Sequence, residues 1–445
     1  MTITDQFIDK VYSIAETDLT VDSIHQIKRC LLDYTGVVFA GHRNGREQLE
    51  QLKSQGSPGV CSVIGGGDKT DIYTAMLVNG FAAHILELDD GHRVGAPHLE
   101  ANIFSAMIAA AQKEKLTFER FAKGVIVGYE ATIRLASSIQ PGHKLRGFHS
   151  SGTCGTIGTA FAVGYAMGLS REKLKCAISV AATSSAGLLQ VTDDESELKP
   201  YNIANAAISG TIAAYIGKCG FRSPEDVLGG KRGFFSALAD EVKYELLVGE
   251  QPDLGIFQIY VKPFAACRHA HAAIECALNI CQDHMIIPED IKEVEIQIYS
   301  LAISGHDHVD VKNASSAKMS IPYSVAAAIV LGSCNIDAYT PSNINREDIR
   351  ELSGKIHLHE NSRLTSEYPG KRGSIVKIIL SDGNTYEHEV EYPLGEPEHN
   401  ITDDQLMLKY NELMNYAQVP DNEAKDISAA IWNLEDKFKD FLEMI

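Results

Sequence analysis

The sequence predicts a mainly α-helical protein with two domains. Its 445 residues exceed the ~250 to 300 residues at which a single hydrophobic core stops growing. Helical periodicity extends from residue 1 to about residue 255 and returns after residue 400, whereas runs of β-branched residues appear between these regions. We therefore expect a helical domain of residues 1–255 and 400–445, provided that the tail returns to the first bundle, and an α+β domain of residues 256–399.

Three segments rich in Ala, Gly and Ile define the helical region: residues 151–170, 175–190 and 203–220. Their small residues recur at spacings of three and four, which lets neighbouring helices approach closely. The glycine-rich turns do not match the phosphate-binding pattern GxxxxGK(S/T), because Lys69 follows an aspartate and Lys231 precedes an arginine. A compact helical bundle without a phosphate loop is predicted.

Strand patterns characterise the α+β region. The runs IFQIYVKPF (256–264) and VEIQIYSLAI (294–303) are rich in β-branched residues. Two later runs flank an Asp-Gly pair at 382–383, which is a strong hairpin signal. Helical stretches begin near Arg268 and Ser320, so strands and helices alternate here.

Composition excludes several classes of protein. The net charge of 40 − 59 = −19 argues against a nucleic-acid partner, because a backbone binder needs clustered Lys and Arg. An anionic substrate would need a local basic pocket on so acidic a protein. The nine cysteines form no CxxC pair, so we expect reduced thiols in a cytoplasm. The N-terminus does not resemble a signal peptide, and no run of about 18 apolar residues occurs, so no membrane partner is expected.

The densest group of titratable residues is LELDDGHRVGAPH (86–98). If the preceding helix continues through Asp90, Glu87 and Asp90 share a face and Asp89 points elsewhere. Carboxylates at a helix C-terminus oppose the macrodipole, so something other than helix stability favours them. With the histidines up to His98, a reaction site is favoured over a solvated helix end.

Three further positions have both a functional and a structural interpretation. His149 precedes a glycine- and threonine-rich helix start, where backbone N–H groups can bind a carboxylate, or it is a capping or core histidine. Lys199 stands before Pro200 after an acidic loop and is either a substrate ligand or a surface lysine. Tyr323 lies just inside a helix and is either a proton donor or a core aromatic.

Basic residues also gather at the junction of a strand and a helix, where Lys262 and Arg268 precede the pair His269/His271. The spacing HxH recurs at 306/308 and 357/359. Alternation on a strand can aim both imidazoles one way, as a metal requires. No third ligand stands at a suitable spacing beside any pair, so we expect no metal.

Taken in order, these segments resemble the MmgE/PrpD family. The resemblance is carried by AMLVNGFAAHILELDDGH, RGFHSSGTCGTIGTA, LKPYNIANAA, VKPFAACRHAHAAI and SIPYS. The family includes 2-methylcitrate dehydratase, cis-aconitate decarboxylase and iminodisuccinate epimerase. It implies a large all-helical domain formed by both chain termini, an inserted smaller α+β lid domain, and a homodimer.

The resemblance also implies which residues act. Acid–base roles fall to Glu87, Asp90, His98, His149 and Tyr323, with His98 as the main proton-transfer group. Substrate carboxylates are bound by Lys199, Lys262, Arg268 and His271, since cationic donors pair well with carboxylates. No metal or organic cofactor is expected.

Four positions depart from the family pattern. Where the family pattern has aspartate, threonine, proline and histidine, this chain has Glu87, Gly91, Leu99 and Asn202, respectively. Polar side chains that touch a substrate set its orientation and the bond that breaks. The identity of the substrate therefore stays open.

The family chemistry passes through a carbanion-like centre beside a carboxylate, which needs cations at the oxygens and a well-placed base. If a β-hydroxyl leaves, the enzyme is a dehydratase. If the proton returns to the opposite face, the enzyme is an epimerase, and if carbon dioxide leaves, it is a decarboxylase. We expect a small di- or tricarboxylate substrate and a lyase of the 2-methylcitrate dehydratase type. Three alternatives stay open: an epimerase of a substituted succinate, a cis-aconitate decarboxylase-like lyase, and a non-catalytic carboxylate-binding dimer.

Overall fold

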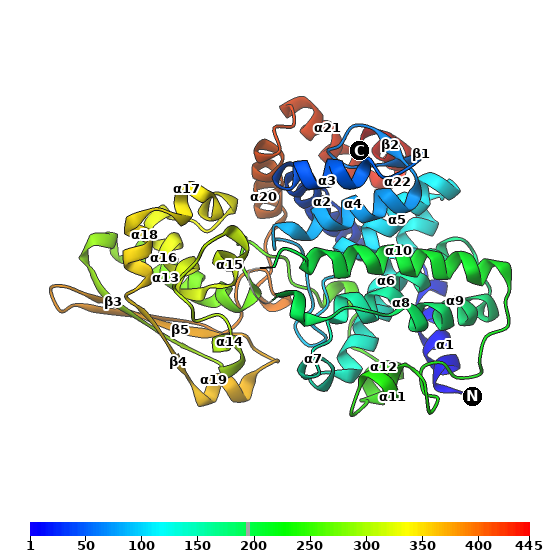
Figure 1. Cartoon of the computed structure of the whole chain (residues 1–445), viewed down its shortest axis with the longest axis horizontal. Helices are drawn as coiled ribbons and strands as arrows, with labels where there is room; N and C mark the ends of the chain where they lie inside the picture. The colour runs from blue at the N-terminus through cyan, green and yellow to red at the C-terminus, as the bar shows by residue number, and fades with distance from the viewer. Residues whose placement is uncertain (193–195) are drawn as a thin grey trace. The chain divides into compact units, whose positions relative to one another are not determined.

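The computed structural model describes residues 1–192 and 196–445, and its mainly α-helical character confirms the predicted fold class. The chain divides into two compact units (Figure 1). The helical unit comprises residues 1–85, 89–259 and 402–445, and the mixed unit comprises residues 86–88 and 260–401. Both chain ends therefore lie in the helical unit.

The helical unit is built almost entirely from helices and their connections. Two short strands, β1 (Pro58–Ser62) and β2 (Lys69–Thr70), pair antiparallel. Its helices are α1 (Ile3–Glu16), α2 (Val21–Asn44), α3 (Arg46–Lys53), α4 (Ile72–Ile85), α5 (Glu100–Glu114), α6 (Phe118–Ile139), α7 (Gly142–Leu145), α8 (Ser150–Ala166), α9 (Arg171–Ser184), α10 (Lys199–Cys219), α11 (Phe234–Leu238), α12 (Tyr244–Val248), α20 (Asp403–Tyr416), α21 (Asp421–Trp432) and α22 (Leu434–Met444).

Sequence signals explain where several of these helices begin. Thr2, Thr20 and Thr402 each accept a hydrogen bond from the backbone three residues later, which forms capping boxes at α1, α2 and α20. The helix α20 packs against α2, and Lys409 of α20 lies 2.5 Å from the buried carboxylate of Asp33. The C-terminal segment thus returns to the N-terminal helices.

The core of the helical unit forms around α8, which packs against α6, α9 and α10 (Figure 1). Small residues permit this close packing. A Cβ atom at Gly210 of α10 would lie 2.5 Å from the Cβ of Thr159 and 2.6 Å from the carbonyl oxygen of Thr156, both on α8. The predicted close approach of helices is confirmed at this contact.

The mixed unit contains a four-stranded sheet with the order β4-β3-β5-β6. The strand β3 (Ile291–Ile298) runs parallel to β4 (Ile356–Glu360), and β5 (Ser374–Leu380) is antiparallel to both β3 and β6 (Thr385–Val390). The helix α13 packs against β5, β6 and α16 (Figure 1). The helices are α13 (His271–His284), α14 (Ser300–Ile303), α15 (Ala314–Met319), α16 (Ile321–Leu331), α17 (Pro341–Ile344), α18 (Glu347–Ser353) and α19 (Ser362–Glu367).

The strand predictions have mixed outcomes. The β5–β6 hairpin is confirmed, and Gly383 has a φ of 93° in its turn. The strand predicted at 256–264 is wrong, because a 3-10 turn (Gly255–Phe257) starts this segment and Pro263 lacks the N–H that a ladder needs. The strand β4 was not predicted, because its sequence IHLHE contains only two apolar residues.

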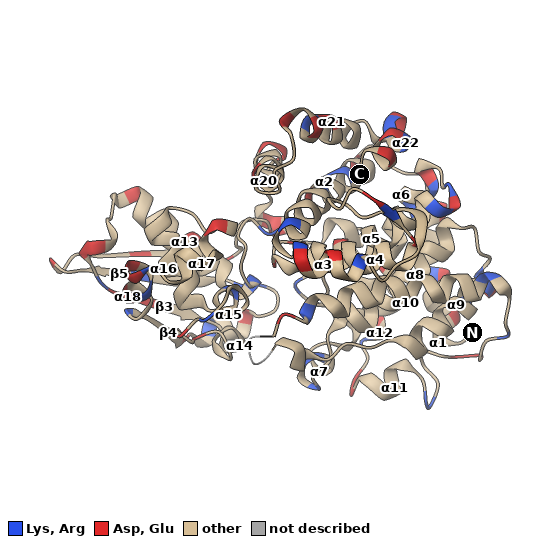
Figure 2. Cartoon of the chain, turned by 45° about the horizontal axis from the view of Figure 1, so that its top comes forward, with Lys and Arg blue, Asp and Glu red and all other residues tan. Residues whose placement is uncertain are grey.

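Charged residues of both signs are distributed along the chain (Figure 2). Acidic and basic residues are interspersed along exposed helices such as α3 and α22 (Figure 2). Within the parts of the chain that the structure describes, no helix combines the length and apolar character that crossing a membrane requires. The nine cysteines are free thiols.

Candidate active site

The acidic run after α4 does not continue the helix, and the prediction that it does is wrong. The helix ends at Ile85, and Glu87 has a φ of 54°, in the left-handed region. Asp89, which helical geometry would turn away from the site, therefore takes a different position.

The buried carboxylate of Asp89 joins two imidazoles. Its Oδ2 atom lies 2.7 Å from Nδ1 of His84, on α4, and 3.2 Å from Nδ1 of His98. The centroids of the two rings are 4.4 Å apart. Sequence reasoning assigned no role to His84 or Asp89, although both lie in the segment that carries the family resemblance.

This trio also has the composition of a metal site, since its ligand atoms lie within 4.8 Å of one another. However, the 2.7 Å between His84 and Asp89 is the length of a direct hydrogen bond. Two ligands of one tetrahedral zinc ion lie farther apart, at about 3.3 Å. The contacts favour a hydrogen-bonded relay over a cation at this position.

His98 is held through both its ring and its backbone. Its Nδ1 atom lies 2.8 Å from the carbonyl oxygen of Asp90, and its backbone N–H donates to the hydroxyl of Ser151 at 2.9 Å. A carbonyl oxygen only accepts, so Nδ1 carries a proton. Nε2 is then the nitrogen that would exchange a proton with a substrate.

The Asp90 side chain caps the N-terminus of α5. Its Oδ1 atom accepts hydrogen bonds from the backbone N–H groups of Leu99 and Glu100, both at 2.9 Å, and its Oδ2 atom accepts one from the hydroxyl of Tyr129 at 3.0 Å. Burial raises the pKa of Asp90 to about 7, although these donors act in the opposite direction. These contacts give Asp90 a positioning role, because it fixes both α5 and His98.

His149 supplies a second imidazole at the start of α8. Its Nε2 atom lies 3.1 Å from the Oγ atom of Ser151, and its Nδ1 atom lies 3.2 Å from the amide nitrogen of Asn202. The His149 ring is 6.3 Å from that of His98. Asn202, at the position where the family pattern has histidine, therefore orients His149 directly.

These contacts define what we name the imidazole cluster: His84, Asp89, His98, His149 and Asn202. Lys199, which follows the acidic loop, is the first residue of α10 and is partly exposed. Asn202 follows it by three residues, so the two side chains lie on one face of the helix. The first turn of α10 thus carries an ammonium on the same face as a member of the cluster.

In the mixed unit, Lys262 is completely buried and pairs with Glu87. The Nζ atom lies 2.9 Å from the carbonyl oxygen of Glu87 and 3.2 Å from its Oε2 atom. A buried ammonium is costly without such a partner. The carboxylate and carbonyl of Glu87 together stabilise it.

Arg268 was predicted to bind a substrate carboxylate, but the structure directs its five N–H donors to the protein. Nε and one terminal nitrogen contact Glu396 at 3.2 and 2.9 Å. The remaining donors reach Nδ1 of His271 and the carbonyl oxygens of Leu394 and Pro393. In this conformation Arg268 links the start of α13 to residues 393–396 of the same unit by hydrogen bonds.

His271, predicted to bind substrate, and Tyr323, predicted to act in acid–base chemistry, both make hydrogen bonds within the mixed unit. Nε2 of His271 donates to the carbonyl oxygen of Ala266 at 3.1 Å, while Nδ1 accepts from Arg268. The hydroxyl of the buried Tyr323 donates to the carbonyl oxygen of Ala338 at 2.6 Å, and burial raises its pKa. Both side chains bond within the mixed unit, which favours the core interpretation of Tyr323.

The helical unit therefore combines three imidazoles, a buried carboxylate and a lysine at a helix start. Such groups transfer protons next to an anion. Together with the fold, they define an acid–base enzyme.

Comparison with known proteins gives the family. The model of the MmgE/PrpD N-terminal domain matches residues 5–247, and that of the C-terminal domain matches residues 264–436. The chain belongs to the MmgE/PrpD family, as its motifs predict. Cis-aconitate decarboxylase of Aspergillus terreus is 22% identical over 97% of this chain and 93% of its own length. The cis-aconitate decarboxylase of Mus musculus is 23% identical over 92% of this chain and 86% of its own length. That of Homo sapiens is 25% identical over 86% of this chain and 82% of its own length.

Proposed function

We propose that this protein is a lyase that acts beside a carboxylate of a small tricarboxylate, with cis-aconitate as the first candidate substrate. The observation that carries the proposal is the hydrogen-bonded chain from His84 through Asp89 to His98. Sequence reasoning favoured 2-methylcitrate dehydratase. The relatives described above are named for decarboxylation, and we propose that reaction instead.

In the proposed reaction, the bond between a substrate carbon and one carboxylate breaks and carbon dioxide leaves. The electron pair spreads over the neighbouring double bond and a remaining carboxylate, and the resulting carbanion takes a proton from Nε2 of His98. The carboxylate of Asp89 stabilises the imidazolium that donates this proton. Water returns a proton to His98, so the product is an unsaturated dicarboxylate with one carbon fewer.

The substrate carboxylates need cationic partners. We assign this role to Lys199 and to the N-terminus of α8, where the helix dipole favours an anion. Substrate binding by Lys262 stays a prediction. The homodimer that the family resemblance implies also stays a prediction. Replacement of Lys199 by methionine is expected to raise KM more than it lowers kcat.

One observation favours a second candidate, an epimerase of a substituted succinate. An epimerase needs two acid–base groups that reach opposite faces of one carbon. His98 and His149 are two imidazoles whose ring centroids are 6.3 Å apart. This candidate predicts hydrogen exchange without net consumption of substrate.

Proton NMR of the protein in deuterated buffer distinguishes the candidates. The panel contains cis-aconitate, 2-methylcitrate, citrate and substituted succinates. A new dicarboxylate with one deuterium from solvent and stoichiometric carbon dioxide supports decarboxylation. Loss of water from 2-methylcitrate would support the dehydratase. Exchange of substrate hydrogen for deuterium without consumption of the substrate would support the epimerase. If no compound reacts but several bind, the protein is a carboxylate-binding dimer and the proposal fails.

A further inference from the structure

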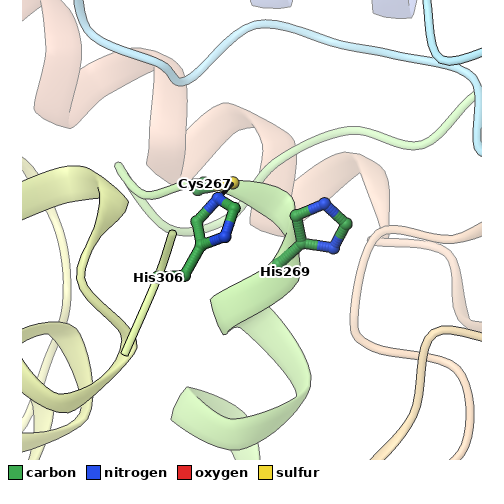
Figure 3. A group of neighbouring side chains, drawn as sticks. All are labelled: Cys267, His269 and His306. Atoms are coloured by element: carbon green, nitrogen blue, oxygen red, sulfur yellow. Dashed lines mark hydrogen bonds between the residues drawn. The ribbon is translucent and has the colours of Figure 1, made fainter. Parts of the chain in front are cut away.

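Three side chains with metal-binding atoms converge before α13 in the mixed unit (Figure 3). Cys267 and His269 flank Arg268 in the chain, and His306 comes from the segment after α14. One sulfur and two ring nitrogens lie within 4.8 Å of one another. His269 is buried, and the other two residues are partly buried. We name this group the Cys-His-His cluster.

One separation in the cluster already fits a metal ion. The Sγ atom of Cys267 lies 3.5 Å from Nε2 of His306. In a tetrahedral zinc site with bonds of about 2.3 Å to sulfur and about 2.0 Å to nitrogen, these two atoms are about 3.5 Å apart. The third ligand atom, a ring nitrogen of His269, lies within 4.8 Å of both.

The surrounding hydrogen bonds orient both imidazoles for metal binding. Nδ1 of His306 lies 2.9 Å from the carbonyl oxygen of Ser304, which only accepts, so the ring proton resides there and Nε2 carries the lone pair. Nδ1 of His269 lies 2.5 Å from the hydroxyl of Tyr299, which makes Nε2 the nitrogen that His269 would offer. Ligand histidines usually engage their second nitrogen in this way.

We propose that the Cys-His-His cluster binds a zinc-class divalent cation. Thiolate and imidazole ligands favour zinc over magnesium or calcium, which prefer oxygen ligands. The thiolate reduces the charge of the bound dication, and the neighbouring Arg268 is already paired with Glu396 at 2.9 Å. Three protein ligands leave one coordination position for water.

The sequence could not reveal this group, because its members belong to different motifs. His269 comes from one HxH pair and His306 from another, and the third ligand is a cysteine. The second members of the two pairs turn elsewhere: His271 bonds Arg268 and Ala266, and His308 bonds the carbonyl oxygen of Ser316 at 3.1 Å. The prediction that no metal binds rested on spacing within each pair alone.

The test uses the full-length protein, treated with a chelator and then titrated with Co²⁺. We expect one Co²⁺ per chain, visible absorption bands of a tetrahedral ion, and a near-ultraviolet sulfur-to-cobalt charge-transfer band. Zn²⁺ should displace the Co²⁺ and abolish the spectrum. Cys267→Ser should remove the charge-transfer band, and His306→Asn should weaken binding on the order of 100-fold.

Matched controls come from the same unit. Cys281→Ser removes another partly buried thiol, and His308→Asn removes a histidine two residues from His306; both should keep the cobalt spectrum. Circular dichroism of the metal-free variants shows whether they fold. Absence of tetrahedral Co²⁺ in the folded parent protein, or a charge-transfer band that survives Cys267→Ser, would overturn the proposal.

Discussion

At the scale of single residues, the carboxylate of Asp89 links His98 to His84. It lies 3.2 Å from Nδ1 of His98 and 2.7 Å from Nδ1 of His84. A carboxylate behind an imidazole fixes its tautomer and stabilises its charged form. The reactive nitrogen of His98 is therefore Nε2, and its removal should affect chemistry more than binding.

We predict that His98→Asn lowers kcat by about 10² to 10⁴-fold, the range typical of a lost general acid or base. The asparagine amide keeps a donor for the carbonyl oxygen of Asp90 but cannot transfer a proton. Steady-state kinetics on the substrate identified by NMR measure the effect. His359→Asn, at an exposed position on β4, serves as the control and should change kcat less than twofold. A His98→Asn enzyme with parental kcat would refute the assignment.

Asp90→Asn should change how stability depends on pH. The pKa of Asp90 rises from 3.8 in the unfolded chain to about 7 in the folded protein. The folded state therefore binds this proton more tightly, and its contribution to stability is fully present below pH 3.8 and lost as pH rises through 7. Asparagine cannot titrate, so the variant loses this dependence.

The measurement is urea unfolding of the parent and Asp90→Asn proteins at several pH values between 4 and 8. The free energy of unfolding of the parent, relative to the variant, should fall as pH rises. The charge of Asp90 contributes to the raised pKa of Glu100, so part of the Glu100 effect is lost in the variant and adds to the same fall. A difference that is constant with pH would contradict a raised pKa at Asp90.

Tyr323→Phe tests whether this tyrosine takes part in catalysis. Its hydroxyl donates to the carbonyl oxygen of Ala338 at 2.6 Å, so the structure predicts kcat within twofold of the parent and a stability loss of about 1 kcal/mol. Kinetics and urea unfolding are measured on the same preparation. A 100-fold loss of kcat without a loss of stability would restore the role that the family resemblance implied.

Sequence reasoning found residues that lie in recognisable patterns and missed roles that depend on distant partners. His98 and His149 were found from their motifs. Asp89 was missed because the helix was assumed to continue past Ile85. The internal bonding of Arg268 could not be foreseen, since Glu396 lies 128 residues away in the chain.

At the scale of elements, the contact between α8 and α10 places Asn202 beside His149 at the start of α8. The two helices approach closely at Gly210, where an added Cβ atom would lie 2.5 Å from the Cβ atom of Thr159. Periodicity predicted these helices well, because their small residues recur regularly. It could not give the exact ends that place His149 and Lys199 at the first turns.

Gly210→Ala is predicted to lower the free energy of unfolding by about 1 to 3 kcal/mol, because the added methyl group forces α8 and α10 apart. Urea unfolding followed by the fluorescence of Trp432, the single tryptophan and part of the same unit, measures this loss. Ser209→Ala, on the adjacent position of α10, should change stability by less than about 0.5 kcal/mol. Equal effects of the two changes would argue against a special close contact at Gly210.

At the scale of the whole molecule, the net charge of −19 affects the encounter with an anionic substrate. Acidic and basic residues are interspersed along exposed helices such as α3 and α22 (Figure 2). Composition predicted the acidity and the mainly helical fold correctly. It could not predict that Lys262 is buried beside Glu87, because this contact depends on the folded structure.

Salt dependence should therefore be weak. Enzymes that attract their substrates over long distances lose kcat/KM steeply as salt screens the field, over a Debye length of about 10 Å at 0.1 M. For this protein we predict that kcat/KM stays within about threefold, or rises, between low salt and 0.2 M NaCl. A tenfold fall would reveal a long-range basic field that the composition does not predict.

The central claim is proton transfer by His98 beside a substrate carboxylate. Its most direct test is proton NMR of cis-aconitate in deuterated buffer, with the parent enzyme and His98→Asn side by side. We predict that the parent forms a dicarboxylate that carries solvent deuterium and that the variant forms it at least about 100-fold more slowly. Equal deuterium incorporation by both proteins would contradict the account.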